Sequence, residues 1–323
     1  MNKLYIIGNG FDLYHCLDTW YSSFGIYLQK TDEETYDHLL EYLYLPELDE
    51  EDEVSLKDPL WSTFENSLAG LDIEEVLEKF SEYSANPGSD DFSDGDWDTI
   101  RVYVSEVKKH LTDKLLENFK TFVQNVHYPD TDDLTLLNLE ENAIYLNFNY
   151  TKTLELYYNI PSDQILYIHN KADGISPLIL GHGLHPEKFR KEEPKMPENM
   201  SLEEQEQWMD FQSNNYDLSI ENGRDELIDY FQTTFKSTEK IISNNISFFN
   251  SLKSIQEINV LGHSISQVDA LYFKTIIGMP NKNKITWNVS YHKEDEKLKK
   301  KQSLIDLGLD ASQINLCKME DFI

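Results

Sequence analysis

The chain has 323 residues, of which 40% are apolar and 27% charged, a composition that supports a packed globular core and argues against a disordered chain. Its 28 Lys and Arg against 59 Asp and Glu give a net charge of −31, which opposes sequence-nonspecific binding of DNA or RNA. The two cysteines, Cys16 and Cys317, lack zinc-site spacing, and no apolar run is long enough for a signal peptide or a membrane span. We therefore expect a cytoplasmic protein with no metal site and no nucleic-acid or membrane partner.

The N-terminus has the pattern of a strand, a glycine turn and a helix. Leu4–Ile7 predicts a buried strand that ends at the turn Gly8–Gly10, and a helix is expected from Phe11 to Leu17. Glycines after a strand let the backbone approach a phosphate, and the amides of a helix N-terminus bind anions even in an acidic protein. A tight turn without a ligand has the same spacing, and the third glycine of the dinucleotide fingerprint is replaced by Leu13.

Residues 30–135 are predicted to form a helical insertion after this first strand and turn. Ile100–Val126 is its clearest helix, because apolar side chains recur there every three or four residues and share one face. Shorter helices are expected at Tyr36–Leu45 and Ile73–Tyr83, and Asn86–Trp97 is rich enough in Gly, Pro, Ser and Asp to predict a loop.

Strands and helices alternate in the remainder of the chain, with a polar excursion over 185–217. The predicted strands are Ala143–Phe148, Ile165–Ile168, Leu178–Leu180, Ile258–Leu261, Ile285–Val289 and Ile314–Cys317. The predicted helices are Thr151–Tyr158, Leu227–Phe235, Ile241–Leu252, Gln267–Ile277 and Glu294–Ser303. This alternation predicts an α/β, Rossmann-like fold with a mostly parallel sheet flanked by helices. Residues 1–29 and 136–323 would form that core.

Three further polar motifs follow predicted strands, and ligands of open α/β sheets bind beyond the carboxyl ends of strands. Asn147–Thr151 supplies amides that can orient a water or a ribose hydroxyl, although an Asx turn or a helix cap fits equally. His169 is a candidate general base or sugar ligand, or a structural histidine. Gly262–Ser266, followed by Asp269, is a second glycine turn that binds an anion or caps a helix.

Several blocks of the sequence together resemble the AbiH family of phage abortive-infection proteins. The N-terminal IIGNGFDLYHCLDTWYSSF is similar to the opening of that family, and LWSTFE, LNFNYT followed by Glu155, YIH and LGHSISQVDALYF are similar to its later blocks. The resemblance implies an antiviral defence effector with an unidentified phage trigger, and it is compatible with a homo-oligomer. Cys16 and Asp18 stand where the family pattern has Gly and Pro, so Cys16 either crowds a ligand or takes a backbone angle that Cys disfavours.

That family is in turn similar to sirtuin-like NAD-binding proteins of bacterial defence. The similarity implies a pocket for NAD(P) and aligns Asn149 with the Asn expected to act in glycosidic cleavage, and His169 with the sugar-contacting or catalytic His. Thr151 replaces the Asp of the sirtuin-like block, and Asn170 replaces the Gly after its His. The residues expected to contact the nucleotide are Gly8, Asn9, Gly10, Phe11, Asp12, Thr19, Tyr150, Gly262, His263, Ser264 and Asp269.

Two functions are therefore expected. In the first, a defence effector binds NAD(P) and hydrolyses its nicotinamide N-glycosidic bond, with Asn149 positioning the water or the ribose and His169 accepting a proton or orienting the sugar. In the second, the same pocket holds a nucleotide without turnover, as a regulatory or assembly module of a defence system. A nuclease or phosphodiesterase is opposed by the charge of −31 and by the missing metal motif.

Overall fold

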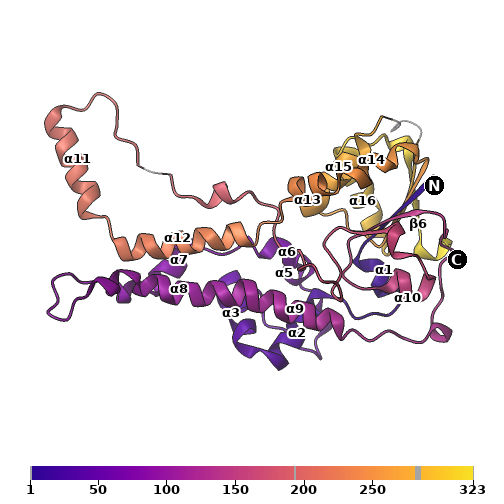
Figure 1. The fold of residues 1–323 in the computed structure, drawn as a ribbon, viewed down its shortest axis with the longest axis horizontal. Coiled ribbons are helices and arrows are strands. Elements are labelled where there is room, and N and C mark those ends of the chain that lie inside the picture. Colours follow the sequence, from indigo (N-terminus) through magenta and orange to yellow (C-terminus); the bar gives the residue numbers. More distant parts are fainter. Residues whose placement is uncertain (1, 193, 281–284, 323) are drawn as a thin grey trace.

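A computed structural model of the protein describes residues 2–192, 194–280 and 285–322. One end of the molecule is built around a parallel β-sheet (Figure 1). The sheet has six strands in the order β3-β2-β1-β4-β5-β6, and each adjacent pair is parallel. The strands are β1 (Lys3–Ile7), β2 (Ile144–Asn147), β3 (Ile165–Tyr167), β4 (Glu257–Leu261), β5 (Thr286–Ser290) and β6 (Ile314–Cys317). This is the strand order of doubly wound Rossmann folds, so the predicted α/β fold is confirmed.

The central strand β1 is buried on both faces, which explains why it reads as a continuous apolar run. Leu4 and Ile6 pack into the core on one face, and Tyr5 and Ile7 pack into the core on the other, as the alternation of a strand requires. Ile7 is in register with the last residue of β2 on one side and the last residue of β4 on the other. The carboxyl ends of these three strands therefore lie at the same level.

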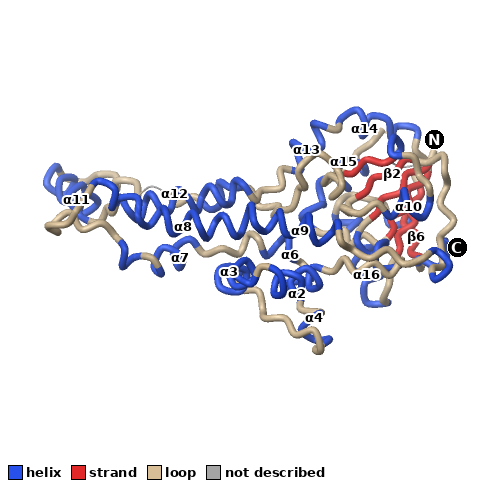
Figure 2. The backbone as a smooth tube through the Cα atoms, turned by 60° about the horizontal axis from the view of Figure 1, so that its bottom comes forward, coloured by secondary structure: helices blue, strands red, loops and turns tan. Residues whose placement is uncertain are grey.

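Helices cover both faces of the sheet (Figure 2). The first face packs against Phe11 of α1 and Leu154 of α10. The second packs against helices that contribute Ile241, Phe249 and Phe273, among other residues. The helices of the two layers are α1 (Asn9–Tyr14) and α10 (Thr153–Tyr158) on the first face, and α13 (Thr238–Asn244), α14 (Ile246–Ser251), α15 (Ala270–Ile277) and α16 (Glu294–Asp306) on the second.

A helical arm extends away from the sheet (Figure 1). Its helices are α2 (Tyr21–Thr31), α3 (Glu33–Leu43), α4 (Glu53–Leu56), α5 (Pro59–Ser62), α6 (Phe64–Ser67), α7 (Ile73–Lys79), α8 (Thr99–Lys109), α9 (Leu115–Gln124), α11 (Leu202–Asn214) and α12 (Leu218–Thr233). The helix α12 runs along α8, and its Leu227 and Phe231 share one core with Val104 and Leu111. The arm thus takes in α11 and α12 as well as the predicted insertion, and the domain boundaries at 29 and 135 remain a prediction.

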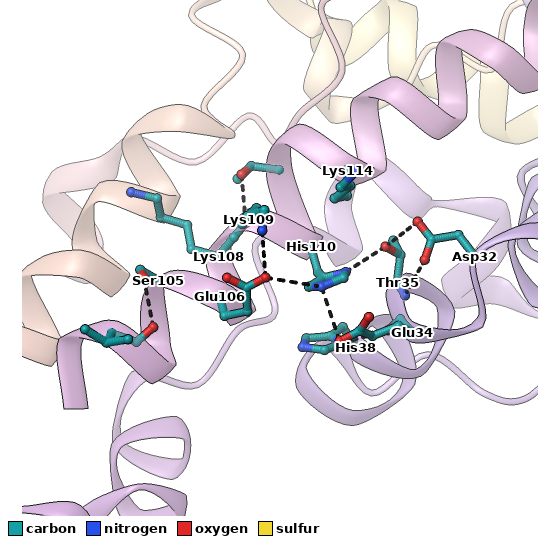
Figure 3. Close-up of polar contacts among 12 residues, drawn as sticks. Asp32, Glu34, Thr35, His38, Ser105, Glu106, Lys108, Lys109, His110 and Lys114 are labelled. Carbon is teal, nitrogen blue, oxygen red and sulfur yellow. Dashed lines mark hydrogen bonds and ion pairs between the residues drawn. The ribbon is translucent and has the colours of Figure 1, made fainter. Parts of the chain in front are cut away.

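The long helix predicted in the insertion is interrupted by a π-helical turn at His110–Lys114, which joins α8 to α9. His110 is buried and points from this turn toward α3 (Figure 3). Its Nδ1 lies 2.9 Å from Oγ1 of Thr35, which in turn donates to Asp32, and its ring stacks on His38 with centroids 4.4 Å apart. Because the Thr35 hydrogen is used on Asp32, Nδ1 of His110 is the donor, and the pair fixes α3 against the turn.

The prediction of a strand at Leu178–Leu180 is wrong. β3 is the edge strand of the sheet, and the segment that follows it is held by a hydrogen bond from the Ile179 N–H to the His169 carbonyl, 3.0 Å long. Leu178 packs into the core of the arm instead of the sheet. A three-residue apolar run does not distinguish a strand from a buried loop. The predicted helix Ile241–Leu252 is also divided, between α13 and α14.

Candidate functional site

The strand order reverses beside β1, and this switch point lies at the carboxyl edge of the sheet. The chain passes from β1 to β2 and β3 on one side and then crosses to β4 on the other. The four polar motifs follow these four strands, at Gly8–Gly10, Phe148–Thr151, Ile168–Asn170 and Gly262–Ser266. All four motifs are therefore located where ligands of doubly wound folds bind.

The two glycine turns at this edge are in direct backbone contact. The Gly8 N–H donates to the Leu261 carbonyl at 3.0 Å, and the Gly10 N–H donates to the Gly262 carbonyl at 2.8 Å. A Cβ added to Gly8 would lie 2.6 Å from the Cα of His263, and Gly262 has a φ of +68°. The glycines are needed for this close approach, and two amides of the first turn are already hydrogen-bonded within the protein.

Asn9 and Thr19 bind each other at the outer end of the first turn. Asn9 Nδ2 donates to the Thr19 carbonyl at 2.9 Å, and Thr19 Oγ1 donates to Asn9 Oδ1 at 2.7 Å. Cys16, between them in sequence, is exposed and has a φ of +58°. This is the left-handed conformation that Gly adopts readily and Cys does not, so the position imposes the backbone angle that the sequence comparison anticipated.

Asp12 is the centre of a buried group on the α1 and α10 face of the sheet. Its carboxylate accepts hydrogen bonds from Thr151 Oγ1 at 2.6 Å and Thr153 Oγ1 at 2.7 Å. Burial raises the pKa of Asp12 to about 6, although these hydroxyls oppose the shift. Asn149 lies beside this group and donates from Nδ2 to the Gly8 carbonyl at 3.2 Å. The hydrogen bond between Thr151 and Asp12 thus joins the loop after β2 to α1.

A second group forms on the opposite face, where two histidines approach one carboxylate. His169 Nε2 lies 3.9 Å from Asp269 Oδ1, and His263 Nε2 lies 3.6 Å from Asp269 Oδ2. Ser266 Oγ also donates to Oδ2, at 3.1 Å. The ring of Phe148 packs edge-to-face against both histidines, with centroid distances of 5.4 and 4.4 Å. The end of β2 therefore supplies the apolar wall between the ends of β3 and β4.

Both histidines are neutral at pH 7 because they are buried. His263 Nδ1 accepts a hydrogen bond from the Ile265 N–H at 2.8 Å, which places its proton on Nε2, toward Asp269. Burial lowers the pKa of His263 to about 4 and lowers that of His169 well below its ordinary value, and the positive charge of Lys236 contributes to both shifts. Nε2 of His169 is buried without a hydrogen-bond partner, a condition that is rare in native proteins.

Lys236 and Glu65 extend this group into the helical arm. The Lys236 side chain is fully buried and donates to Asp269 Oδ1 at 3.0 Å and to Glu65 Oε2 at 2.8 Å. Tyr21 on α2 donates to the other oxygen of Glu65 at 3.1 Å. Burial alone would raise the pKa of Asp269, but Lys236 and the nearby His263 hold it at about 2. We call these six residues the junction cluster: Tyr21, Glu65, His169, Lys236, His263 and Asp269.

The motif Gly181–Gly183 positions the lysine of the junction cluster. The His182 N–H donates to the Thr234 carbonyl, and the Lys236 N–H donates to the His182 carbonyl, both at 2.9 Å. A Cβ on the first glycine would lie 2.0 Å from the Thr234 oxygen, and one on the last would lie 3.3 Å from the Cα of Val268. The motif is therefore packed between the segment that carries the lysine and the segment that carries the aspartate.

The structure separates the predicted site residues into these two groups. His169, His263 and Asp269 meet in the junction cluster, and the ring of Tyr150 lies 6.1 Å from that of His169. Asn149 bonds to the glycine turn and shares no hydrogen bond with His169 among the described residues. Phe11 is buried in the core beneath α1, and Ser264 is exposed.

Glu65 and Lys236 were not predicted from the sequence. Glu65 closes the block LWSTFE, which the family resemblance singled out without giving the carboxylate a role. Lys236 follows Phe235 with no glycine, capping or spacing signal, and only the packing of the Gly181–Gly183 motif brings it to Asp269.

Comparison with known proteins identifies one family. The family model described as bacteriophage abortive infection AbiH matches residues 4–291. Comparisons with curated proteins and with solved structures give no match. In the part of the chain that the structure describes, no helix combines the length and apolar character needed to cross a membrane.

Proposed function

The chain belongs to the bacteriophage abortive infection AbiH family, and we propose that it acts in that defence by binding NAD(P) at the carboxyl edge of its sheet and hydrolysing the nicotinamide–ribose bond. The sequence blocks suggest NAD(P) as the ligand, and the topology of the sheet suggests where it would bind. The switch point beside β1 is where doubly wound folds hold nucleotides.

The observation that carries the proposal is the unpartnered Nε2 of His169. This nitrogen is buried, and its ring is uncharged at pH 7. Since Nε2 has no partner, the hydrogen bond of the ring to the Phe148 backbone places the ring hydrogen on Nδ1 and leaves Nε2 as an acceptor, 3.9 Å from a carboxylate that a buried lysine holds ionised. An uncharged acceptor beside a fixed negative charge suits a ribose hydroxyl, which needs an acceptor for its hydrogen. Leaving such an atom unpaired costs about 1–3 kcal/mol, a cost that a bound sugar would remove.

The same arrangement suits the chemistry of glycosidic cleavage. When the C1′–N1 bond of NAD breaks, its electron pair neutralises the pyridinium nitrogen, nicotinamide leaves uncharged, and positive charge develops on the ribose. Asp269 would stabilise that charge, because its low pKa keeps it ionised. Water then adds to C1′ and loses one proton to solvent or to a neighbouring base. His169 would orient the sugar by accepting its hydroxyl hydrogen.

Asn149 and the exposed ends of the two turns would hold the rest of the nucleotide. Asn149 donates to the Gly8 carbonyl and so fixes the first turn, and we propose that its remaining amide oxygen orients the water or the ribose. Because the amides of Gly8 and Gly10 are occupied, the phosphates would lie further out, near Asn9 and Ser264, which are exposed.

Mass spectrometry of NAD, NADP and ATP incubated with purified protein tests the proposal. The wild-type chain should release nicotinamide from NAD or NADP, and His169→Ala and Asn149→Ala should reduce the rate by about 100-fold or more. His127→Ala, which changes a histidine outside both site groups, should retain the wild-type rate and serves as the matched control. Nicotinamide release by His169→Ala at the wild-type rate would show that this mechanism is wrong.

A second candidate is a nucleotide-binding module without turnover. Two observations favour this candidate. The glycine turns contact each other directly, and Glu65 and Tyr21 of the arm close the junction cluster. A ligand bound there would lie where the arm meets the sheet and would change how these two parts pack. In the same assay this candidate predicts intact nucleotides, one of which stays with the protein through gel filtration.

A further inference from the structure

The helix α11 stands at the far end of the arm and packs against nothing that buries it (Figure 1). None of its residues is buried. Three of its apolar side chains are largely exposed: Leu202 at 79%, Met209 at 51% and Phe211 at 63%. Tyr216, which follows the helix, is 63% exposed. Isolated exposed apolar residues are ordinary, but a whole helix that presents them is typical of a surface that binds a partner.

The same segment is strongly acidic. Residues 196–217 contain six carboxylates and no Lys or Arg, the six being Glu198, Glu203, Glu204, Glu206, Asp210 and Asp217. Among the described residues none of these six takes part in an ion pair within the chain, although Glu204 bonds the capping Ser201. The surface therefore combines apolar and negatively charged groups whose charges are not neutralised by the protein itself.

A hollow of about 230 Å³ lies at the same end of the arm, in the loop between α7 and α8. The residues that line it include Tyr83, Phe92, Asp91 and Asp96. It adjoins the start of α12, where the Ala85 N–H donates to Ser219 Oγ at 3.0 Å. This volume is below the roughly 300–1,000 Å³ of small-molecule pockets, so it suits a single side chain. A lining that combines aromatic and acidic residues suits the cationic end of Lys or Arg.

We propose that α11 and this hollow form a docking surface, the arm-tip surface, for a Lys- and Arg-rich apolar segment of another protein. Apolar side chains of that segment would cover Met209 and Phe211, and one of its cations would enter the hollow. Met is common at surfaces that accept varied apolar partners, because its side chain adapts to different shapes. This inference rests on the arm alone and does not depend on the proposed NAD(P) chemistry.

Charge separates this occupant from the alternatives. Nucleic acid and anionic lipid carry the same sign as the six carboxylates and would be repelled. A second copy of the chain would bring a further net charge of −31 to the contact. A basic protein segment is attracted on approach and then desolvates the apolar side chains. Of these classes, it alone satisfies both features of the surface.

Fluorescence anisotropy with a defined peptide tests the proposal on the full chain. The probe is a labelled amphipathic helix of leucine and lysine, about 18 residues long, or five helical turns. We expect binding that weakens with added salt, and a loss of about tenfold or more in affinity for Met209→Gln/Phe211→Gln. Leu298→Gln removes a side chain that is 76% exposed on α16, at the other end of the molecule, and should bind as the wild type does.

A second probe separates the surface from general attraction to an acidic protein. A peptide with the same lysines and with serines in place of the leucines should bind at least about tenfold more weakly. Unchanged binding to Met209→Gln/Phe211→Gln, or equal binding of the two peptides, would overturn the proposal. Self-association in sedimentation velocity that the double variant abolishes, or binding of a DNA duplex or anionic vesicles through α11, would also overturn it. Because α11 buries none of its residues, the variants should keep the wild-type melting temperature.

Discussion

Asp12 is a buried carboxylate held by two threonine hydroxyls and by no cation among the described residues. Its neighbours, Thr151 and Thr153, each donate one hydrogen bond, but burial still raises its pKa to about 6 from an ordinary value of 3.8. A raised acid pKa means that the folded state binds the proton more tightly than the unfolded state does. The charged form is therefore the less stable one in the fold, and acidification between pH 6 and pH 4 favours folding through this group.

Asp12→Asn should remove that pH dependence. The difference of the two pKa values corresponds to about 3 kcal/mol, present as a penalty above pH 6 and absent below pH 4. Urea unfolding at several pH values measures it: the free energy of unfolding of the variant minus that of the wild type should fall by up to that amount from pH 7 to pH 4. A difference that stays constant with pH would show that Asp12 is not strained by its burial.

At the scale of single residues, the family resemblance anticipated one backbone conformation, that of Cys16. Cys16 stands where the family pattern has Gly and has a φ of +58°, and Asn170, for which no backbone angle was predicted, has a φ of +66°. Asn tolerates the left-handed region better than Cys does, because its side chain bonds the local backbone. Here Asn170 Nδ2 donates to the Pro177 carbonyl at 2.6 Å. The backbone angle at Cys16 could be predicted because a glycine requirement is local.

At the scale of elements, the two glycine turns show why the candidate site could be predicted only in part. A glycine after a strand permits close approach of a phosphate or of another backbone, and the spacing is the same for both. In this fold the backbone of the first turn, at Gly8 and Gly10, packs directly against the backbone of the second turn, at Gly262. The motifs predicted that both turns lie at one edge of the sheet, but not that their backbones contact each other directly.

In the junction cluster, the buried Lys236 links Glu65 of the arm to Asp269 at the edge of the sheet, and this linkage can be tested. Lys236→Met leaves Glu65 and Asp269 facing each other without a cation, so it should lower the free energy of unfolding by about 3–5 kcal/mol. Glu65→Gln in the same chain removes one of the unpaired charges and should recover about 1 kcal/mol or more. Guanidinium unfolding of the single and double variants gives both values. Strict additivity of the two changes, or a loss below about 1 kcal/mol for Lys236→Met, would contradict the linkage.

At the scale of the molecule, the parallel sheet could be predicted because strands buried on both faces read as apolar runs between turns. The long polar excursion could not be placed in the same way. The helix that follows it, α12, pairs with α8, more than a hundred residues earlier, through side chains that are apolar in both but carry no sequence signal for each other. Lys236 lies shortly after the end of α12, so the pairing of α12 with α8 also helps to bring this lysine to the edge of the sheet.

The architecture places the arm over the edge where the nucleotide is proposed to bind. Glu65 and Tyr21 come from the arm, whereas His169, His263 and Asp269 come from loops of the sheet. A ligand that enters this edge must therefore change contacts between the two parts of the molecule. The helices α8 and α12 lie between this edge of the sheet and the arm-tip surface (Figures 1 and 2).

Hydrogen–deuterium exchange with and without NAD tests the proposed position of the nucleotide site, because it reports where a nucleotide acts and does not depend on turnover. We expect slower exchange on addition of NAD in the loops at 8–12, 147–151, 168–171 and 262–269, with no change in α11. Protection confined to other segments, or no protection at a nucleotide concentration that saturates binding, would contradict the placement of the site at the carboxyl edge of the sheet.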